Sequence, residues 1–241
     1  MTPAALPHLL VLVTFMLGAA PAATLGAGHD LRLGGETPAI SEDALDALRA
    51  LERRPRHLDP TQFRRQVAAH RDELLHDPGS PVGGNRGGDV TVVEFFDYRC
   101  GYCIAMAPRL ETLLEADHGL RFVYKEWPIL GPMSEFAARA ALAARRQGRY
   151  EDFHSALMRL RGRLTEATVF NAARRLGLDP ERLRADMKSP EIDRVLRDNR
   201  ALAAELGITG TPAFVIGDRL VPGAVPLGEL KAVIAAARSA G

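Results

Sequence analysis

The stretch VTVVEFFDYRCGYC, residues 90–103, constrains the fold of this chain more than any other. Its apolar first half is rich in β-branched and aromatic residues, which predicts a buried strand. Over about residues 104–118 the apolar positions recur at helical spacing, which predicts a helix. Cys100 and Cys103, the two cysteines of the chain, therefore lie on a strand-to-helix turn, at the start of the helix.

This placement predicts redox chemistry for the two thiols. A helix N-terminus carries partial positive charge and free N–H groups, which stabilise a thiolate. We expect Cys100 to be exposed at the helix start and able to attack a disulfide. We expect Cys103, one turn further on, to be more buried and to release the resulting mixed disulfide.

Two other uses of the cysteines are less consistent with the spacing. A structural disulfide over three residues closes a very small loop and removes little entropy from the unfolded chain. A zinc site needs about four ligands, and the chain has no second cysteine pair and only scattered histidines. We therefore expect no metal and no bound cofactor, the redox-active group being the Cys100–Cys103 pair itself.

Charge and hydropathy exclude other classes. Lys and Arg number 31 and Asp and Glu 30, which gives no electrostatic basis for a nucleic-acid partner. Apolar residues make up 46% of the chain, enough for a sizeable core. No apolar run reaches the ~18 residues that a membrane span needs.

The first residues predict export. Residues 9–17 are apolar, small residues follow, and Ala20-Pro21-Ala22 fits a cleavage site, so residues 1–22 resemble a secretory signal peptide although no Lys or Arg precedes the apolar stretch. We expect the mature chain to begin at Ala23 in the periplasm or cell envelope, where disulfides persist.

Residues 23–76 are predicted to form a flexible lead followed by a helical extension. One helix begins near Ser41, and a second begins at Asp59-Pro60, an N-cap followed by proline at the first helical position. Each has an apolar side, formed by Ile40, Leu48 and Leu51 and by Phe63, Val67 and Leu74. Two interpretations remain open: docking on the core of the same chain, or homo-oligomerisation through residues 41–76.

Residues 77–241 are predicted to form one α/β domain. The turn-rich segment at 77–89 marks its boundary, and a second strand is expected at 120–127. A series of capped helices fills about 131–207. AFVI and RLVP then predict two strands joined by Gly217-Asp218, before a closing helix. This order indicates a thioredoxin-like fold with an inserted helical subdomain and an N-terminal helical extension.

Five motifs follow one another over residues from about 76 to 238: VVEFFDYRCGYC, FVYKEWPILGP, AARAALAA, LGITGTPAFVIGDRLVPGA and the final helix. On these motifs, this part of the chain resembles the DsbA-like thiol:disulfide oxidoreductases of the bacterial envelope. The resemblance implies that Cys100 is the nucleophile and Cys103 the resolving thiol. It implies that Pro212 is cis and faces the active site, so that the Thr211 backbone can pair with a substrate strand. It also implies that Glu94 is a buried carboxylate near the resolving thiol; the alternative is an ordinary strand residue that faces solvent.

Three further residues are candidates with less definite roles. Lys125 lies on the neighbouring strand and could pair with Glu94 or be a surface charge. Tyr98 is expected at an apolar rim that unfolded substrates touch, and Trp127 is expected at that rim or in the core.

The direction of exchange stays open between oxidase, isomerase and reductase. Gly101-Tyr102 between the thiols and Thr211 before the proline are more similar to isomerase and reductase members. The resemblance implies unfolded or misfolded exported proteins as substrates and a membrane redox partner of the DsbB or DsbD type. The alternatives are an envelope holdase or surface-exposed binding protein, whose cysteines would be incidental, and a glutathione-transferase-like role, which would not require Cys103.

Overall fold

The computed structural model describes residues 58–240. The helices that follow one another along the chain are α2 (Pro60–Ala69), α3 (Arg71–Leu75), α4 (Gly101–Ala116), α5 (Pro132–Ala144), the short 3₁₀ helix η1 (Arg145–Gln147), α6 (Tyr150–Met158), α7 (Glu166–Arg175), α8 (Pro180–Asp186), α9 (Pro190–Glu205) and α10 (Leu227–Ala240). The strands are β1 (Val82–Gly84), β2 (Val90–Phe96), β3 (Leu120–Glu126), β4 (Ala213–Ile216) and β5 (Arg219–Pro222). None of the helices in this part of the chain combines the length and apolar character needed to cross a membrane.

The strands form one mixed sheet in the order β1-β3-β2-β4-β5. β2 and β3 pair in parallel at its centre, while β1, β4 and β5 each join antiparallel. The link between β4 and β5 is the predicted two-residue turn, in which Gly217 adopts a φ of 59°. Helices α5 to α9 intervene between β3 and β4, so the thioredoxin-like α/β fold with an inserted helical subdomain is confirmed.

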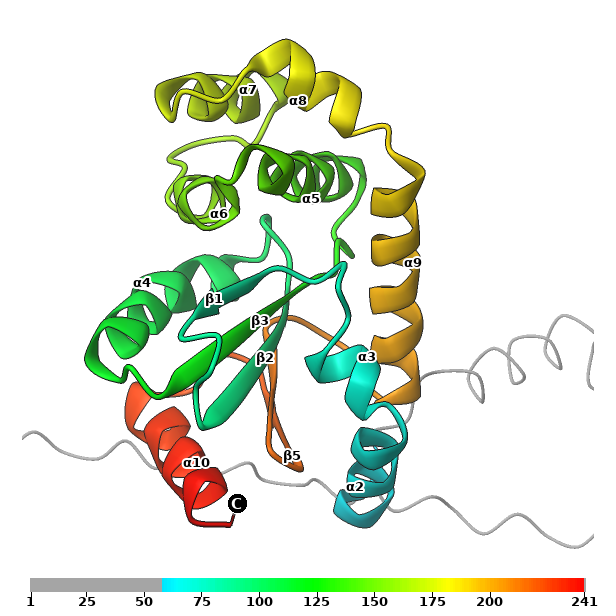
Figure 1. The fold of residues 1–241 in the computed structure, drawn as a ribbon, viewed down its shortest axis with the longest axis vertical. Coiled ribbons are helices and arrows are strands. Elements are labelled where there is room, and N and C mark those ends of the chain that lie inside the picture. The colour runs from blue at the N-terminus through cyan, green and yellow to red at the C-terminus, as the bar shows by residue number, and fades with distance from the viewer. Residues whose placement is uncertain (1–57, 241) are drawn as a thin grey trace, which may run out of the picture. The chain divides into compact units, whose positions relative to one another are not determined.

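The two faces of the sheet are covered by different helices (Figure 1). Side chains alternate along a strand, so Val92 and Phe96 of β2 lie in the core cluster that holds residues of α4 and α10. Val93 and Phe95 lie in the cluster on the other face, with residues of α2, α3 and α9. Both faces of the central strand are therefore buried, which its nearly continuous apolar sequence requires.

Local capping signals set the helix starts. Asp59 accepts hydrogen bonds from the backbone at the start of α2 and forms a capping box with Gln62. Thr165, Asp179 and Ser189 cap α7, α8 and α9 with their side chains. These caps were all predictable, because each side chain bonds within its own first turn.

The segment predicted only as a turn-rich boundary contains a strand. Val82–Gly84 form β1 and pair with the outer edge of β3. A Cβ on Gly83 would lie 2.4 Å from a carboxylate oxygen of Glu151 and 3.0 Å from the ring of Tyr124. A larger residue at Gly83 would require the flexible Glu151 side chain to move. The strand forms because β3 offers an unpaired edge, a tertiary effect that local propensity does not report.

The second helix of the extension docks on its own chain. Phe63, Val67 and Leu74 are all buried, and they share a cluster with Val93 of β2 and Leu202 of α9. For these three side chains the oligomeric interpretation was wrong, because the sheet of the same chain covers them. The turn-rich segment at 77–89 is accordingly not a break in packing.

The rest of the predicted N-terminal region lies outside the described residues. This applies to the signal peptide at 1–22, to the lead from Ala23, and to the apolar side formed by Ile40, Leu48 and Leu51. Homo-oligomerisation through residues 41–76 remains a proposal, and it would have to use side chains other than Phe63, Val67 and Leu74.

We predict that Phe63→Ala lowers the free energy of unfolding by about 3–5 kcal/mol, because it leaves a cavity between α2 and the sheet. Arg65→Ala on the exposed side of the same helix should change it by less than about 0.5 kcal/mol. Urea denaturation of both variants, with light scattering for mass, measures the effect. A Phe63→Ala protein of unchanged stability but reduced mass would contradict the docking described here.

Candidate active site

Cys100 is the N-cap of α4. After β2 ends, the chain makes a tight turn in which the Cys100 amide donates to the carbonyl of Asp97 at 3.1 Å. Cys100 has extended backbone angles, and its Sγ accepts a hydrogen bond from the Cys103 amide at 3.5 Å. The predicted position of the thiols at the start of a helix is thus observed, with one donor of the helix N-terminus directed at the first sulfur.

The prediction that Cys100 is exposed was wrong. Only 6% of the residue is accessible, against 1% for Cys103. The Cys100 thiol donates to the carbonyl oxygen of Thr211 at 3.2 Å, so the loop before β4 lies against it. The peptide bond between Thr211 and Pro212 is cis, as the resemblance implied.

Glu94 is buried on the same side of the sheet as the thiols. It is 2% exposed, and burial raises its pKa to about 8. Burial also raises the pKa of the Cys103 thiol, and the negative charge of Glu94 raises it further. The two groups therefore disfavour each other's anions, and the site favours one shared negative charge over two.

Asp97 organises the loops around Cys100. Its buried carboxylate accepts from the Arg99 amide at 2.7 Å and from the amides of Ile129 and Leu130 at 2.8 and 2.9 Å. It joins the turn after β2 to the loop after β3. Sequence reasoning missed this residue, although an Asp three residues before a helix N-cap is a common turn signal.

Four large apolar side chains of the described residues are exposed, two in the helix that follows this turn and two in the loop that Asp97 joins to it. Tyr102 and Ile104 occupy the first turn of α4, with exposed fractions of 70% and 37%. Ile129 and Leu130 belong to the loop that Asp97 holds. Exposed large apolar side chains are often found where a protein contacts an apolar partner, so these four are candidates for such a contact.

Behind the turn lies a buried polar cluster. One carboxylate oxygen of Glu126 accepts from the hydroxyls of Tyr98 and Tyr150, both at 2.8 Å. The Tyr98 hydroxyl is also 3.0 Å from Nδ1 of His154. Burial raises the pKa of Glu126 and lowers that of His154 to about 3, so both favour their neutral forms.

This cluster corrects the prediction for Tyr98. The residue is 2% exposed and ties the active-site turn to the end of β3 and to α6. Its ring belongs to the core, not to a rim that substrates touch. Trp127 is also in the core, packed edge-on against Phe95. Neither Glu126 nor His154 was predicted, because their meeting depends on how α6 packs against the sheet.

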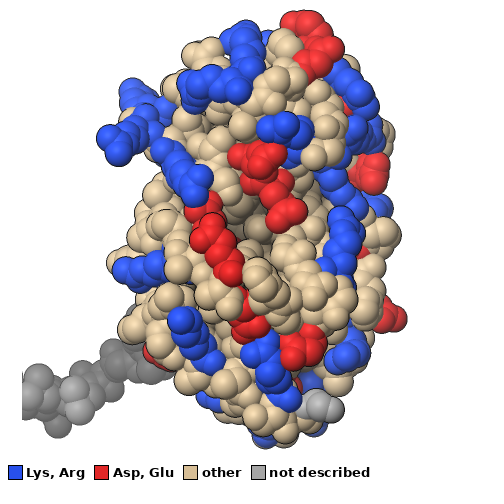
Figure 2. All heavy atoms as spheres, turned by 60° about the vertical axis from the view of Figure 1, so that its left-hand side comes forward, with Lys and Arg blue, Asp and Glu red and all other residues tan. Residues whose placement is uncertain are grey.

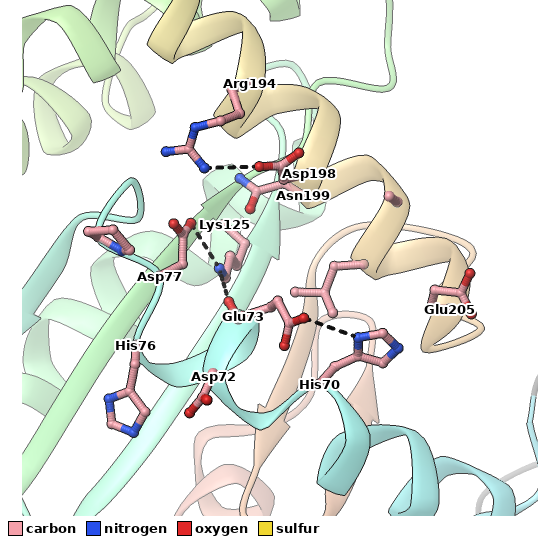
Figure 3. A pocket seen from close by; sticks show the side chains of 13 residues that line it. His70, Asp72, Glu73, His76, Asp77, Lys125, Arg194, Asp198, Asn199 and Glu205 are labelled. Carbon is pink, nitrogen blue, oxygen red and sulfur yellow. Dashed lines mark hydrogen bonds and ion pairs between the residues drawn. The ribbon is translucent and has the colours of Figure 1, made fainter.

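Lys125 pairs with neither Glu94 nor solvent, and Figure 3 shows its ammonium directed at Asp77 and Glu73. The β2–β3 register places Tyr124, not Lys125, beside Glu94, so the two charged groups point to opposite faces. Lys125 is 1% exposed and its ammonium donates to the Glu73 carbonyl at 2.5 Å and to Ser80 Oγ at 2.7 Å.

Asp77 completes the environment of Lys125, with its carboxylate 3.6 Å from the ammonium. Burial lowers the pKa of Lys125 to about 8, and Asp77 opposes the shift. The lysine lies in the wall of a cavity of about 560 Å³ between α3 and α9. It therefore anchors the N-terminal segment to the sheet and lies on the face away from the thiols.

Within residues 58–240 no group of three or more His, Cys, Asp or Glu side chains could hold a metal ion. Cys100 and Cys103 thus stand without further metal-ligating side chains in this part of the chain. The candidate chemistry at this turn is that of two thiols, a buried carboxyl and a carbonyl that faces the first sulfur.

Comparison with known proteins places this site in a family. The family model of the DSBA-like thioredoxin domain matches residues 91–235. The chain belongs to this family. It is therefore related to thiol-disulfide oxidoreductases, with the direction of exchange left open.

Solved structures of the family agree with this assignment. A thioredoxin-like oxidoreductase from Silicibacter pomeroyi DSS-3 is 52% identical with a TM-score of 0.69, covering 71% of this chain and 99% of that one. The thiol-disulfide exchange protein alpha-DsbA2 from Wolbachia pipientis is 28% identical with a TM-score of 0.70, covering 73% and 96%. A periplasmic thioredoxin-like protein from Salmonella enterica serovar Typhimurium is 33% identical with a TM-score of 0.66, covering 71% and 97%.

Among curated proteins the chain is similar to part of larger ones. The Na⁺/H⁺ antiporter NhaA 1 of Salinispora arenicola is 31% identical over 158 residues, which cover 65% of this chain. The match spans only 24% of that protein. The chain is therefore similar to about a quarter of the length of this curated relative.

The buried Glu94 gives the DsbA-like domain a defined pH dependence. Its pKa is about 8 in the folded chain and near 4.5 when unfolded, so between these values the folded state binds more protons and its stability falls as pH rises. We predict that Glu94→Gln, which cannot ionise, is more stable than the parent by roughly 2–4 kcal/mol above pH 8. Near pH 4.5 the difference should shrink towards zero.

Urea denaturation of the reduced proteins at both pH values measures this. Glu115→Gln, at an exposed position of α4, is the matched control and should show no such pH-dependent gain. A Glu94→Gln effect of equal size at both pH values would show that ionisation of the buried carboxyl is not its cause.

The cluster at Glu126 predicts a difference between two substitutions. Glu126→Gln keeps a carbonyl oxygen for both tyrosine hydroxyls and should alter the free energy of unfolding by less than about 1 kcal/mol. Glu126→Leu removes that acceptor and should cost about 1–3 kcal/mol more, because buried hydroxyls lose their partner. Equal stabilities of the two variants would exclude this hydrogen-bonding role.

Proposed function

We propose that this protein exchanges disulfide bonds with exported polypeptides through Cys100 and Cys103. The observation that carries the proposal is the position of Cys100 Sγ, which accepts from the Cys103 amide at the N-cap of α4. An N-terminal amide and the helix dipole stabilise the thiolate that attacks. Membership of the DsbA-like family supports the same chemistry.

The reaction has two steps. The Cys100 thiolate attacks one sulfur of a client disulfide; a new S–S bond forms to the client, and the second client sulfur leaves as a thiolate that takes up a proton. Cys103 then loses its proton and attacks Cys100 Sγ. The Cys100–Cys103 disulfide forms and the client leaves with both thiols reduced. The reverse sequence oxidises a client dithiol.

Glu94 is proposed to hold the proton that Cys103 must lose. The thiol of Cys103 has a raised pKa, so it needs a base close by when it attacks. A carboxyl with a pKa of about 8 can accept and return a proton near neutral pH. Thr211 and the cis Pro212 are proposed to present backbone to the client, which the contact between the Thr211 carbonyl and Cys100 Sγ supports.

Polypeptides are the substrate class that the surface favours. Tyr102, Ile104, Ile129 and Leu130 offer exposed apolar area near the thiols, which suits the apolar segments of unfolded or misfolded chains. We propose that residues 1–22 direct the protein to the periplasm or cell envelope, where such clients are found. A membrane redox partner of the DsbB or DsbD type would restore the thiol pair.

The net direction depends on the reduction potential of the Cys100–Cys103 pair relative to that partner. Isomerisation needs only the first step, because a client thiol then displaces Cys100 and no electrons are transferred overall. Tyr102 is the one residue between the thiols with a side chain that could donate a hydrogen bond, and in the described structure it donates none to Cys100 Sγ. That sulfur accepts from the Cys103 amide.

The function is tested by trapping. Cys103→Ala removes the resolving thiol, so mixed disulfides with clients should accumulate on Cys100. Non-reducing gels of envelope extracts should show adducts that dithiothreitol removes. Cys100→Ala is the matched control and should show none. A Cys103→Ala protein without such adducts would argue against thiol exchange with polypeptides.

The same variants separate exchange from simple holding of clients. If the protein is a holdase with incidental cysteines, the parent and the Cys100→Ala variant should suppress the aggregation of a cysteine-free client equally well. Neither protein should then reduce insulin. The proposed exchange requires the opposite result for insulin: reduction by the parent and its loss in Cys100→Ala.

A further inference from the structure

A second hollow opens beside the active-site turn, on the side of the helical insertion. It is a groove of about 430 Å³, and its apolar lining includes Met133 of α5, Leu157 of α6, and Leu160 and Leu164 of the loop that follows α6. The mechanism proposed above uses none of these four residues. The groove therefore requires a separate explanation.

The groove is lined by residues that flank the two cysteines in the chain. Tyr98 and Arg99 line it and directly precede Cys100 in the chain, while Ile104, which directly follows Cys103, lines it from the first turn of α4. A polypeptide held on Cys100 as a mixed disulfide would therefore have the groove within reach of its neighbouring residues.

The charge of the lining has one sign. Arg99 and Arg163 both line the groove, and no Asp or Glu does. Arg99 donates to the carbonyl of Leu130, a neutral partner. The guanidinium of Arg163 has no hydrogen bond or ion pair with any other residue of the described chain. Two guanidinium groups are thus left without a carboxylate.

The surroundings differ from the groove itself. Figure 2 shows one face of the molecule, with acidic side chains in a band down its middle and basic side chains at the upper left and around the edges. Arg159, close in sequence to Arg163, is already paired with Glu111. Of the arginines that line the groove, neither Arg99 nor Arg163 has a carboxylate partner among the described residues.

We propose that this groove selects clients that carry an acidic residue next to a large apolar one, close in sequence to the reacting cysteine. The apolar side chain contacts Met133, Leu160 and Leu164, and the carboxylate pairs with Arg163 and Arg99. This rests on the proposed exchange with polypeptides and names its substrate preference. An exposed ion pair is worth about 0.2–1 kcal/mol, so each pair favours the acidic residue by about 1.4- to 5-fold, and the two pairs together favour it by at least about 2-fold.

The test uses the rate of mixed-disulfide formation by the Cys103→Ala protein. Each peptide carries one cysteine with a thionitrobenzoate leaving group, whose release is followed by absorbance. A Leu-Glu pair is moved one residue at a time along both sides of the cysteine, and Leu-Lys and Ser-Glu peptides serve as comparisons. Each rate is divided by the rate of the same variant with a small uncharged disulfide.

At one or more positions Leu-Glu should react about 2- to 5-fold faster than Leu-Lys, and faster than Ser-Glu. Arg163→Glu should abolish or invert the ratio of Leu-Glu to Leu-Lys. Arg161→Glu is the matched control: it is exposed, lies two residues away and does not line the groove, so the ratio should persist. The preference should also vanish at ~1 M salt, where the Debye length is about 3 Å.

A ratio near one in the parent, or an equal change in Arg163→Glu and Arg161→Glu, would overturn the proposal. Failure of the proposed function looks different, since neither the peptides nor the small disulfide would then react. In that case fluorescence anisotropy with cysteine-free Leu-Glu and Leu-Lys peptides decides: equal affinities overturn the groove assignment, and a preference lost only in Arg163→Glu supports it.

Discussion

The buried carboxylate of Asp97 is the constraint on which the site depends. Three backbone amides from two loops converge on it, and these hydrogen bonds offset the free-energy cost of burying a polar group. One of these loops begins the helix that Cys100 caps, and the other presents Ile129 and Leu130. A single side chain thus sets the relative position of the reactive sulfur and the apolar surface beside it.

The sheet separates two buried charges that the sequence places on adjacent strands. Glu94 faces the thiols with nothing to offset its burial, and its pKa rises to about 8. Lys125 faces the docked N-terminal helices, where Asp77 and two neutral acceptors surround its ammonium. The first arrangement keeps a carboxyl group with a raised pKa next to the redox pair. The second uses the buried Lys125 ammonium to hold the N-terminal segment against the sheet.

Features that depend on neighbours in sequence were predictable, and features that depend on distant contacts were not. Asp59 and Ser189 cap their helices through bonds within one turn, so sequence patterns identified them. The cysteine spacing located the site for the same reason. By contrast, the contacts of Lys125 depend on the register of β3 and on where the segment with Asp77 and Ser80 lies against it. Local sequence patterns report neither. The burial of Tyr98 depends on Glu126 and α6, and the burial of Cys100 on the distant loop at Thr211.

Trp127 is the single tryptophan of the sequence, and its position has an optical consequence. Its amide donates to the carbonyl of Phe96 at 3.0 Å, where β2 ends, and its indole packs on Phe95 in the core. All tryptophan emission therefore originates at one buried point, between the end of the central strand and the loop that carries Ile129. The protein contains its own fluorophore at the place where the scaffold meets the reactive turn, so spectroscopy can observe that junction without any label.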